Sequence, residues 1–223
     1  MRRQICFALG VFGVMPLFAV AAQHGEWTLN KSAIPGRVQF SIVMADEDGQ
    51  HQNSSSNWNA VDFHGLDWST PGKHDVHFTI SRDAGEIECE GFLKDGEGAG
   101  LFTFMPNPQY ASQMSALGIP GFISERQFAF GLHDVSLDFA RQMKAADIEG
   151  LDAAKLIAFR IHGVSREFVN GIEALGYAHP NANELIALRI HGVTPDYIQE
   201  LRSRGVHNAT LQQLIALRIH GIN

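Results

Sequence analysis

Four histidines in the C-terminal half of the chain recur at a fixed spacing of 29 residues: His133, His162, His191 and His220. Histidine is the commonest side-chain ligand of metals. However, equivalent residues on stacked helical units lie about 8–10 Å apart, whereas a zinc ligand lies about 2 Å from the metal. Successive histidines therefore cannot share one ion. We expect each to lie at the C-terminal end of a helix, where a ring donor or partial charge stabilises the terminal carbonyls and the helix dipole.

Three arginines share this spacing, each two residues before a histidine: Arg160, Arg189 and Arg218. Acidic residues follow the same spacing at Asp138, Glu167 and Asp196. The first repeat lacks both, with Gln109 and Gly131 in their places. Because the arginine and the acidic residue are absent together from the first repeat, we predict that they form a structural ion pair in the others. Such a pair contributes up to about 1 kcal/mol to stability if it is exposed. The alternative is a stripe of arginines that binds carboxylates on a partner.

The N-terminal half offers one further group of chemically capable residues, consisting of Asp62-x-His64, His74-x-x-His77 and the nearby His51. Such a group could bind a metal or act as an acid–base pair. These residues lie in or beside predicted loops, where histidine is commonly just solvated. The chain contains no G-x-S-x-G, P-loop or H-E-x-x-H motif. We therefore predict a protein that is not an enzyme, with no catalytic residue, metal or cofactor.

The repeat itself predicts the elements that position the C-terminal residues. Self-similarity at this period indicates stacked supersecondary units, here residues 106–134, 135–163, 164–192 and 193–221. Each unit should contain two helices and carry one aromatic residue of the series Tyr110, Phe139, Phe168 and Tyr197. The first helices should begin at the N-caps Asn107, Ser136, Ser165 and Thr194. The second should begin near Asp152, Asn181 and Thr210, and Ser124-x-x-Gln127 matches a capping box in the first unit.

Residues 23–105 show the period of two that is typical of strands, as in Val38, Phe40 and Ile42. Asp95-Gly96 predicts a hairpin turn, and the Gly-, Ser- and Asn-rich stretch 50–59 predicts a loop. Four to six strands fit this length as a small antiparallel sandwich or meander. The predicted fold class is therefore α+β: an N-terminal antiparallel β domain followed by a short α-solenoid of four hairpins.

Residues 1–22 match a cleaved signal peptide, with Arg2 and Arg3 before an apolar run and small residues at the cleavage site near Ala22. An uncleaved N-terminal anchor is the alternative. The mature chain should be periplasmic or secreted, without a membrane span. The formal charge of −7 argues against a nucleic-acid partner.

Two further expectations concern Cys89 and the last repeat. Cys89 alternates with apolar residues on a predicted strand, so we expect a small buried core residue. Asn223 stands where the N-cap of a fifth unit would lie. A solenoid end without a polar capping segment exposes apolar surface that can associate with another chain. This predicts a homodimer through the last repeat.

The repeat segments VSREFVNGIEALGY and ELIALRIHGVTPDYIQELRSRG resemble a repeat of bacterial exported proteins that is also appended to BlaR-like antibiotic-sensor membrane metallopeptidases. The resemblance covers about residues 78–223, and the zinc motif and membrane helices of those peptidases are missing from this chain. It implies a non-catalytic extracytoplasmic interaction module, in envelope signalling or sensing, whose partner is another envelope or periplasmic protein. The alternative is a protein that binds a small ligand or glycan through its β domain, with the repeats as scaffold.

Overall fold

The computed structural model describes residues 22–45 and 51–222, so the predicted signal peptide lies outside the described residues apart from Ala22. The N-terminal lobe is one antiparallel sheet of six strands with the order β3-β2-β1-β6-β5-β4. The strands are β1 (Gln23–Lys31), β2 (Arg37–Ala45), β3 (His51–Asn59), β4 (Lys73–Arg82), β5 (Gly85–Lys94) and β6 (Glu97–Pro106). The sheet consists of two three-stranded meanders that are joined through β1 and β6.

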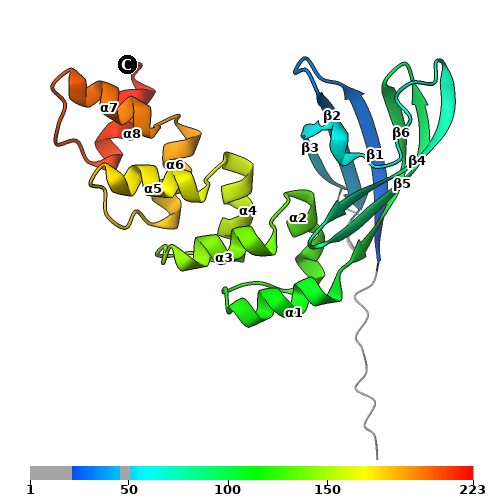
Figure 1. Ribbon diagram of the computed structural model, residues 1–223, viewed down its shortest axis with the longest axis horizontal. Helices are drawn as coiled ribbons and strands as arrows, with labels where there is room; N and C mark the ends of the chain where they lie inside the picture. Colours follow the sequence, from blue (N-terminus) through cyan, green and yellow to red (C-terminus); the bar gives the residue numbers. More distant parts are fainter. Residues whose placement is uncertain (1–21, 46–50, 223) are drawn as a thin grey trace, which may run out of the picture.

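The sheet curls around an aromatic core (Figure 1). Phe40 on β2 and Phe78 on β4 are not on neighbouring strands, yet their ring centroids lie 6.4 Å apart. Phe63, from the β3–β4 connection, packs against both rings at 5.2 and 5.5 Å. The inner face is therefore closed by the curvature of a single sheet and by one connecting segment.

Glycines on β5 and β6 let the indole of Trp27 lie against the sheet. A Cβ at Gly98 would lie 3.3 Å from the Trp27 ring, and one at Gly100 would lie 1.9 Å from the Glu90 carbonyl oxygen. The indole Nε1 donates to the carbonyl oxygens of Glu90 and Leu101, at 3.2 and 3.1 Å. The Trp27 side chain is thus fully buried with its one polar atom satisfied.

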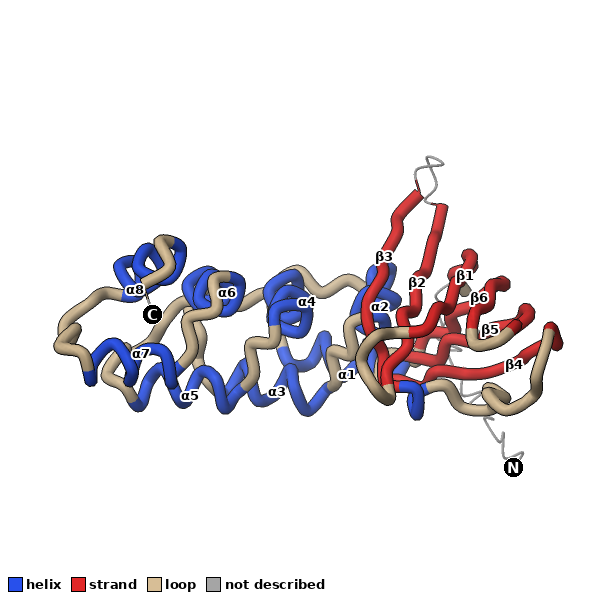
Figure 2. The backbone as a smooth tube through the Cα atoms, turned by 90° about the horizontal axis from the view of Figure 1, so that it is seen from above, coloured by secondary structure: helices blue, strands red, loops and turns tan. Residues whose placement is uncertain are grey.

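The C-terminal lobe consists of helices in two rows (Figure 2). One row holds α1 (Pro108–Leu117), α3 (Leu137–Ala145), α5 (Arg166–Ala174) and α7 (Pro195–Ser203). The other holds α2 (Gln127–Leu132), α4 (Ala153–His162), α6 (Ala182–Ile190) and α8 (Leu211–Ile219). Contacts join α1 to α3, α5 to α7, α4 to α6 and α6 to α8. Among the described residues, no helix is long and apolar enough to cross a membrane.

The helix starts agree with the sequence prediction at seven positions. The expected residue caps its helix through a side-chain oxygen at Asn107, Ser136, Asp152, Ser165, Asn181, Thr194 and Thr210. The prediction of a capping box at Ser124 is wrong. A short 3₁₀ turn, Ser124–Arg126, lies there, and α2 begins at Gln127. The first repeat departs from the others because it packs against the sheet.

A second expectation is also wrong. The predicted loop 50–59 contains β3, which pairs with β2 along its whole length in constant register. An edge strand can be this polar because its backbone pairs with a neighbour while most of its side chains stay in water. The α+β class is confirmed, with six strands in one curled sheet rather than a two-sheet sandwich.

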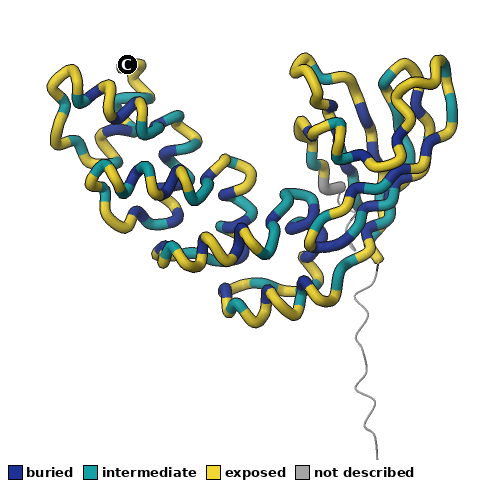
Figure 3. The backbone as a smooth tube through the Cα atoms, viewed as in Figure 1, coloured by how far each residue is buried: buried dark blue, intermediate teal, exposed yellow. Residues whose placement is uncertain are grey.

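Buried residues form two cores, one inside the sheet and one that extends between the two helix rows (Figure 3). The helical core extends without a break from Tyr110 to Leu214. Each lobe contributes one buried residue to the core of the other: Phe128 of α2 belongs to the sheet core, and Ala84 of the β4–β5 turn belongs to the helical core.

Candidate interaction surface

The repeated arginines connect successive helices of the α2-α4-α6-α8 row. Arg189 Nε, on α6, donates to the carbonyl oxygen of His162 at the C-terminal end of α4, at 3.0 Å. The guanidinium also lies over the Phe168 ring, 5.1 Å from its centroid, and against Gly163. A cation at a helix C-terminus is favourable because the last carbonyls lack partners within the helix and carry partial negative charge. Arg189 therefore joins one repeat to the preceding one.

The same geometry recurs one repeat earlier. Arg160 Nε donates to the carbonyl oxygen of His133 at 3.2 Å, and the guanidinium lies 5.3 Å from the Phe139 ring centroid. Arg218 also lies over the aromatic of its own repeat, 4.8 Å from the Tyr197 centroid.

The acidic residues at the repeat spacing are not the partners of Arg160 and Arg189 in this geometry. The ion pair of Arg160 is with Asp134, at 2.5 Å, while Asp138 accepts a hydrogen bond from Gln142 at 2.6 Å. The pKa of Glu167 is lowered by its own backbone N–H and by the Ser165 hydroxyl. The sequence pattern thus paired Arg160 and Arg189 with the wrong acceptors, while the predicted pair of Arg218 with Asp196 stays a prediction.

The repeated histidines lie at the C-terminal ends of α2, α4, α6 and α8. At His133 and His162 the backbone carbonyl, rather than the ring, makes the inter-repeat contact, because an arginine of the next repeat donates to it. Burial lowers the pKa of the His133 ring. The rings of His191 and His220 are exposed.

A buried glutamine fixes the joint between the two lobes. Gln127 is 1% exposed, and its side-chain nitrogen donates to the carbonyl oxygens of Ala84 and Asn107, at 2.5 and 2.7 Å. The three other repeats have leucine at this position. Beside it, the Phe128 ring stacks on Phe102 at 5.4 Å with an interplanar angle of 11°. Polar and apolar contacts together hold the helical lobe at one orientation to the sheet.

An ion network crosses the same joint. Arg82 at the end of β4 pairs with Asp62 at 2.9 Å and lies 3.6 Å from Asp134, which also binds Arg160. The side chain of Arg82 is 14% exposed and lies over the Trp58 ring at 5.1 Å. The network could not be predicted from the sequence because Asp62, Arg82 and Asp134 are far apart in the chain.

The lobes diverge from this joint, and a groove of about 660 Å³ lies between the edge of the sheet and the α2–α4 end of the helices. One wall is β3 and the other is formed by Leu132, His133, Asp134, Arg160 and Ile161. Figure 1 shows β3 on the side of the sheet that is nearest to the helices. Gln127 and Phe128, which join the two lobes, are both buried.

A row of exposed isoleucines continues from this groove. Ile161, Ile190 and Ile219, which we call the isoleucine stripe, are 54%, 54% and 59% exposed. They occupy the same position on α4, α6 and α8, and these helices pack side by side (Figure 2). Isolated exposed apolar residues are ordinary, whereas a row of them at equivalent positions on neighbouring helices is a candidate interaction surface.

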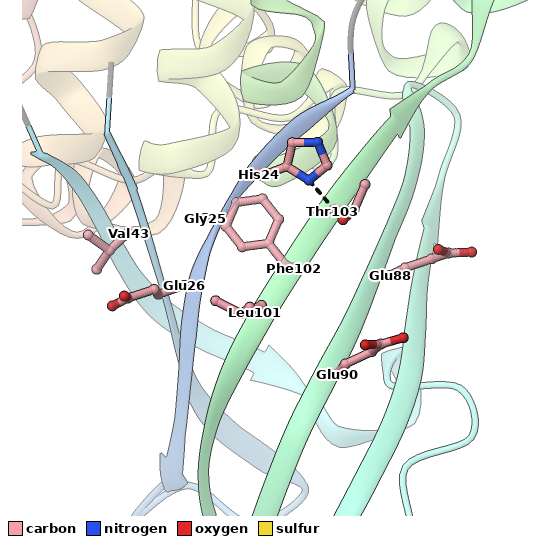
Figure 4. A pocket seen from close by; sticks show the side chains of 9 residues that line it. All are labelled: His24, Gly25, Glu26, Val43, Glu88, Glu90, Leu101, Phe102 and Thr103. Atoms are coloured by element: carbon pink, nitrogen blue, oxygen red, sulfur yellow. Dashed lines mark hydrogen bonds between the residues drawn. The ribbon is translucent and has the colours of Figure 1, made fainter. Parts of the chain in front are cut away.

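The sheet carries a second hollow, of about 520 Å³, on its outer face. Figure 4 shows Leu101 near its centre, with Glu26 on one side and Glu88 and Glu90 on the other. Phe102 also lines it, although this residue is 1% exposed and belongs to the inner core of the sheet. His24 makes a hydrogen bond with Thr103 at 3.0 Å. Within residues 22–45 and 51–222, no group of three or more His, Cys, Asp or Glu side chains is placed to hold a metal.

Among the described side chains, the structure does not bring His64, His74 and His77 together as a metal site, and the side chain of His51 lies outside the described part of the chain. Asp62 bonds Arg82. The His74 ring lies 3.2 Å from each of two backbone carbonyl oxygens, those of Gly72 and Asp67, and the backbone of His64 pairs with Thr79. Cys89 is fully buried, and desolvation raises the pKa of its thiol.

Comparisons of the chain with models of known protein families, with curated proteins and with solved structures gave no match.

Proposed function

We propose that this chain is a non-catalytic extracytoplasmic protein-interaction module that engages another envelope or periplasmic protein through the groove and the isoleucine stripe. The observation that carries this proposal is the stripe itself, in which three isoleucines at equivalent positions are each more than half exposed. A monomeric soluble protein rarely leaves such a row uncovered unless it serves an interaction.

The proposal includes a short α-solenoid of four hairpins at residues 106–221. Its support is the 29-residue period, the matching N-caps of successive helices, and the arginine of one repeat that binds the helix end of the repeat before it. In a solenoid each repeat contacts mainly its neighbours, so the outer surface is long and available to a partner. An extracytoplasmic location is proposed from the predicted signal peptide, and a role in envelope signalling from the resemblance to BlaR-like sensors.

The test is chemical crosslinking of tagged mature chain in its own periplasm, comparing the wild type with two triple variants. Ile161→Ser, Ile190→Ser and Ile219→Ser together remove the stripe. Ala154→Ser, Ala174→Ser and Ala178→Ser form the matched control, at three exposed apolar positions outside the stripe. We expect one dominant protein adduct with the wild type and the control, and its loss in the stripe variant. Equal adducts from all three proteins would refute the proposal.

A second copy of the chain is the alternative partner. Ile222 is 47% exposed, whereas the residues at equivalent positions of the other repeats, Val135, Val164 and Val193, are 0–1% exposed. A homodimer through the last repeat would cover this side chain. Light scattering tests this: a monomer at high concentration excludes the dimer, and a dimer that Ile222→Ser dissociates supports it.

One observation favours ligand binding by the β lobe as the second candidate function. Trp68 is 41% exposed beside a hollow of about 510 Å³ that is lined by the β1–β2, β3–β4 and β5–β6 connections. The turn that presents it is held by Asp67, whose carboxylate accepts bonds from the backbone and side chains of Ser69 and Thr70. An exposed, fixed indole can stack on a sugar ring or an apolar ligand. Titration with chito-oligosaccharide should quench tryptophan fluorescence in the wild type and not in Trp68→Ala.

A further inference from the structure

Of the two edges of the sheet, the β3 edge is the more open one. β3 and β4 are the two edge strands, but the backbone of His64 covers part of the β4 edge by exchanging two 2.9 Å hydrogen bonds with Thr79. On β3, four of the five residues from Asn53 to Asn57 are exposed and Ser54 is half-buried. β3 also lacks proline and lysine, the residues that commonly protect an edge from pairing.

The register shows which groups of β3 point outward. The Ala60 N–H donates to the Gly36 carbonyl oxygen at 3.0 Å, so this pair is a hydrogen-bonded one. In an antiparallel ladder of constant register such pairs alternate. Trp58, Ser56 and Ser54 therefore bond β2, whereas the N–H and C=O groups of Asn57, Ser55 and Asn53 point away from it. The Arg37 guanidinium donates to one of these outward carbonyls, that of Asn57, at 3.1 Å.

The groove beside this edge differs in charge from the rest of the chain. Three arginines line it (Arg37, Arg82 and Arg160) against two aspartates, Asp62 and Asp134, whereas the whole chain has a formal charge of −7. The opposite wall adds apolar surface from Leu132 and Ile161. The edge therefore offers backbone hydrogen bonds, an excess of positive charge and an apolar wall to one occupant.

We propose that the partner protein contributes an extended segment that adds to β3 as a further antiparallel or parallel strand, with an acidic side chain towards Arg37 and apolar side chains against Leu132 and Ile161. Added strands lie about 4.8 Å from an edge and use its main-chain groups for affinity and neighbouring pockets for specificity. This inference rests on the proposed function and identifies the kind of segment that its surface binds.

The experiment separates the backbone of β3 from its side chains. Ser55→Pro removes an outward N–H and places a ring in the path of an added strand, while the ladder to β2 keeps its bonds. Ser55→Ala is the matched control, because it loses the hydroxyl and its hydrogen bonds from Ser41 and Gln39, as Ser55→Pro does, but keeps the backbone N–H. The probe is a displayed library of random ten-residue peptides selected on the wild-type protein. We expect acidic peptides whose affinity is about tenfold or more weaker for Ser55→Pro and nearly unchanged for Ser55→Ala.

A second measurement does not depend on the fold of any variant. Amide hydrogen exchange of the wild-type protein with a selected peptide should show new protection at Asn53, Ser55 and Asn57. Failure to select a peptide, equal binding by Ser55→Pro, or protection confined to the helices would overturn the inference. A dimer that Ser55→Pro dissociates would make a second copy the occupant and would also overturn it.

These outcomes are distinct from the failure of the proposed function. If the isoleucine-stripe variant loses its periplasmic adduct while Ser55→Pro keeps it, the interaction module stands and the added strand is refuted. If neither variant changes the adduct, both are refuted.

Discussion

Replacing Arg189 with alanine should destabilise the helical lobe by about 2 kcal/mol. The change removes a charged hydrogen bond to the His162 carbonyl oxygen, the interaction with the α4 dipole, and the contact with the Phe168 ring. A charged hydrogen bond contributes about 1.5–3 kcal/mol, and the dipole and ring contacts each contribute about 0.5–1 kcal/mol. The side chain is half-buried and these contributions overlap, so the expected total lies near the lower end of their sum.

The assay is thermal denaturation followed by circular dichroism at 222 nm, which reports mainly on the helices. A loss of this size should lower the melting temperature by about 4–8 °C in a protein of this length. Arg189→Lys should lose roughly half as much, because it keeps the charge but not the planar donor geometry.

Glu167→Ala tests the competing explanation, in which Arg189 pairs with the acidic residue at the repeat spacing. We expect a smaller fall in the denaturation midpoint than for Arg189→Ala, because only the hydrogen bonds of Glu167 with its own backbone N–H and the Ser165 hydroxyl are lost, and no coupling between the two substitutions. A midpoint lowered as far as in Arg189→Ala, together with coupling between the two substitutions in a double-mutant cycle, would refute the carbonyl contact as the source of stability.

Three further predictions concern the joint, a turn and one histidine. Gln127→Leu should lower stability by about 2 kcal/mol in calorimetry, since the buried carbonyls of Ala84 and Asn107 lose a donor; unchanged stability would show that the apolar residue of the other repeats serves equally well. Hydrogen bonds from the turn that follows it lower the pKa of Asp67, so its contribution is present above the usual aspartate pKa and is lost as pH falls through the lowered one; Asp67→Asn should reduce the acid dependence of unfolding monitored by tryptophan fluorescence. Burial lowers the pKa of His133, so the unfolded state binds a proton at this ring more readily than the folded state does. The free energy of unfolding should therefore decrease as the pH is lowered through about 6.5, the ordinary pKa of histidine, and His133→Gln should weaken this dependence in melting curves recorded at different pH.

The helical lobe was more predictable from the sequence than the sheet. N-caps and repeat spacing are local signals, and they placed seven helix starts at the observed residues. β3 was missed because its serines and asparagines carry no apolar alternation. Only its pairing with β2, a contact that the local composition does not show, makes this segment a strand.

The interaction surface was predictable in part. The repeat identified Arg160 and Arg189 and suggested acidic partners at the same spacing. The acceptors observed for their Nε atoms are backbone carbonyls 27 residues upstream, and every residue has a carbonyl, so the sequence could not single them out. The role of Gln127 was also hidden, because its partners belong to the β4–β5 turn and the β6–α1 connection.

The most direct test of the central claim is site-specific photo-crosslinking in the periplasm from Ile190, in the middle of the isoleucine stripe, with Ala178 as the control position. The account predicts one dominant adduct with another protein from Ile190 and none from Ala178. No adduct from Ile190, or the same adducts from both positions, would contradict it.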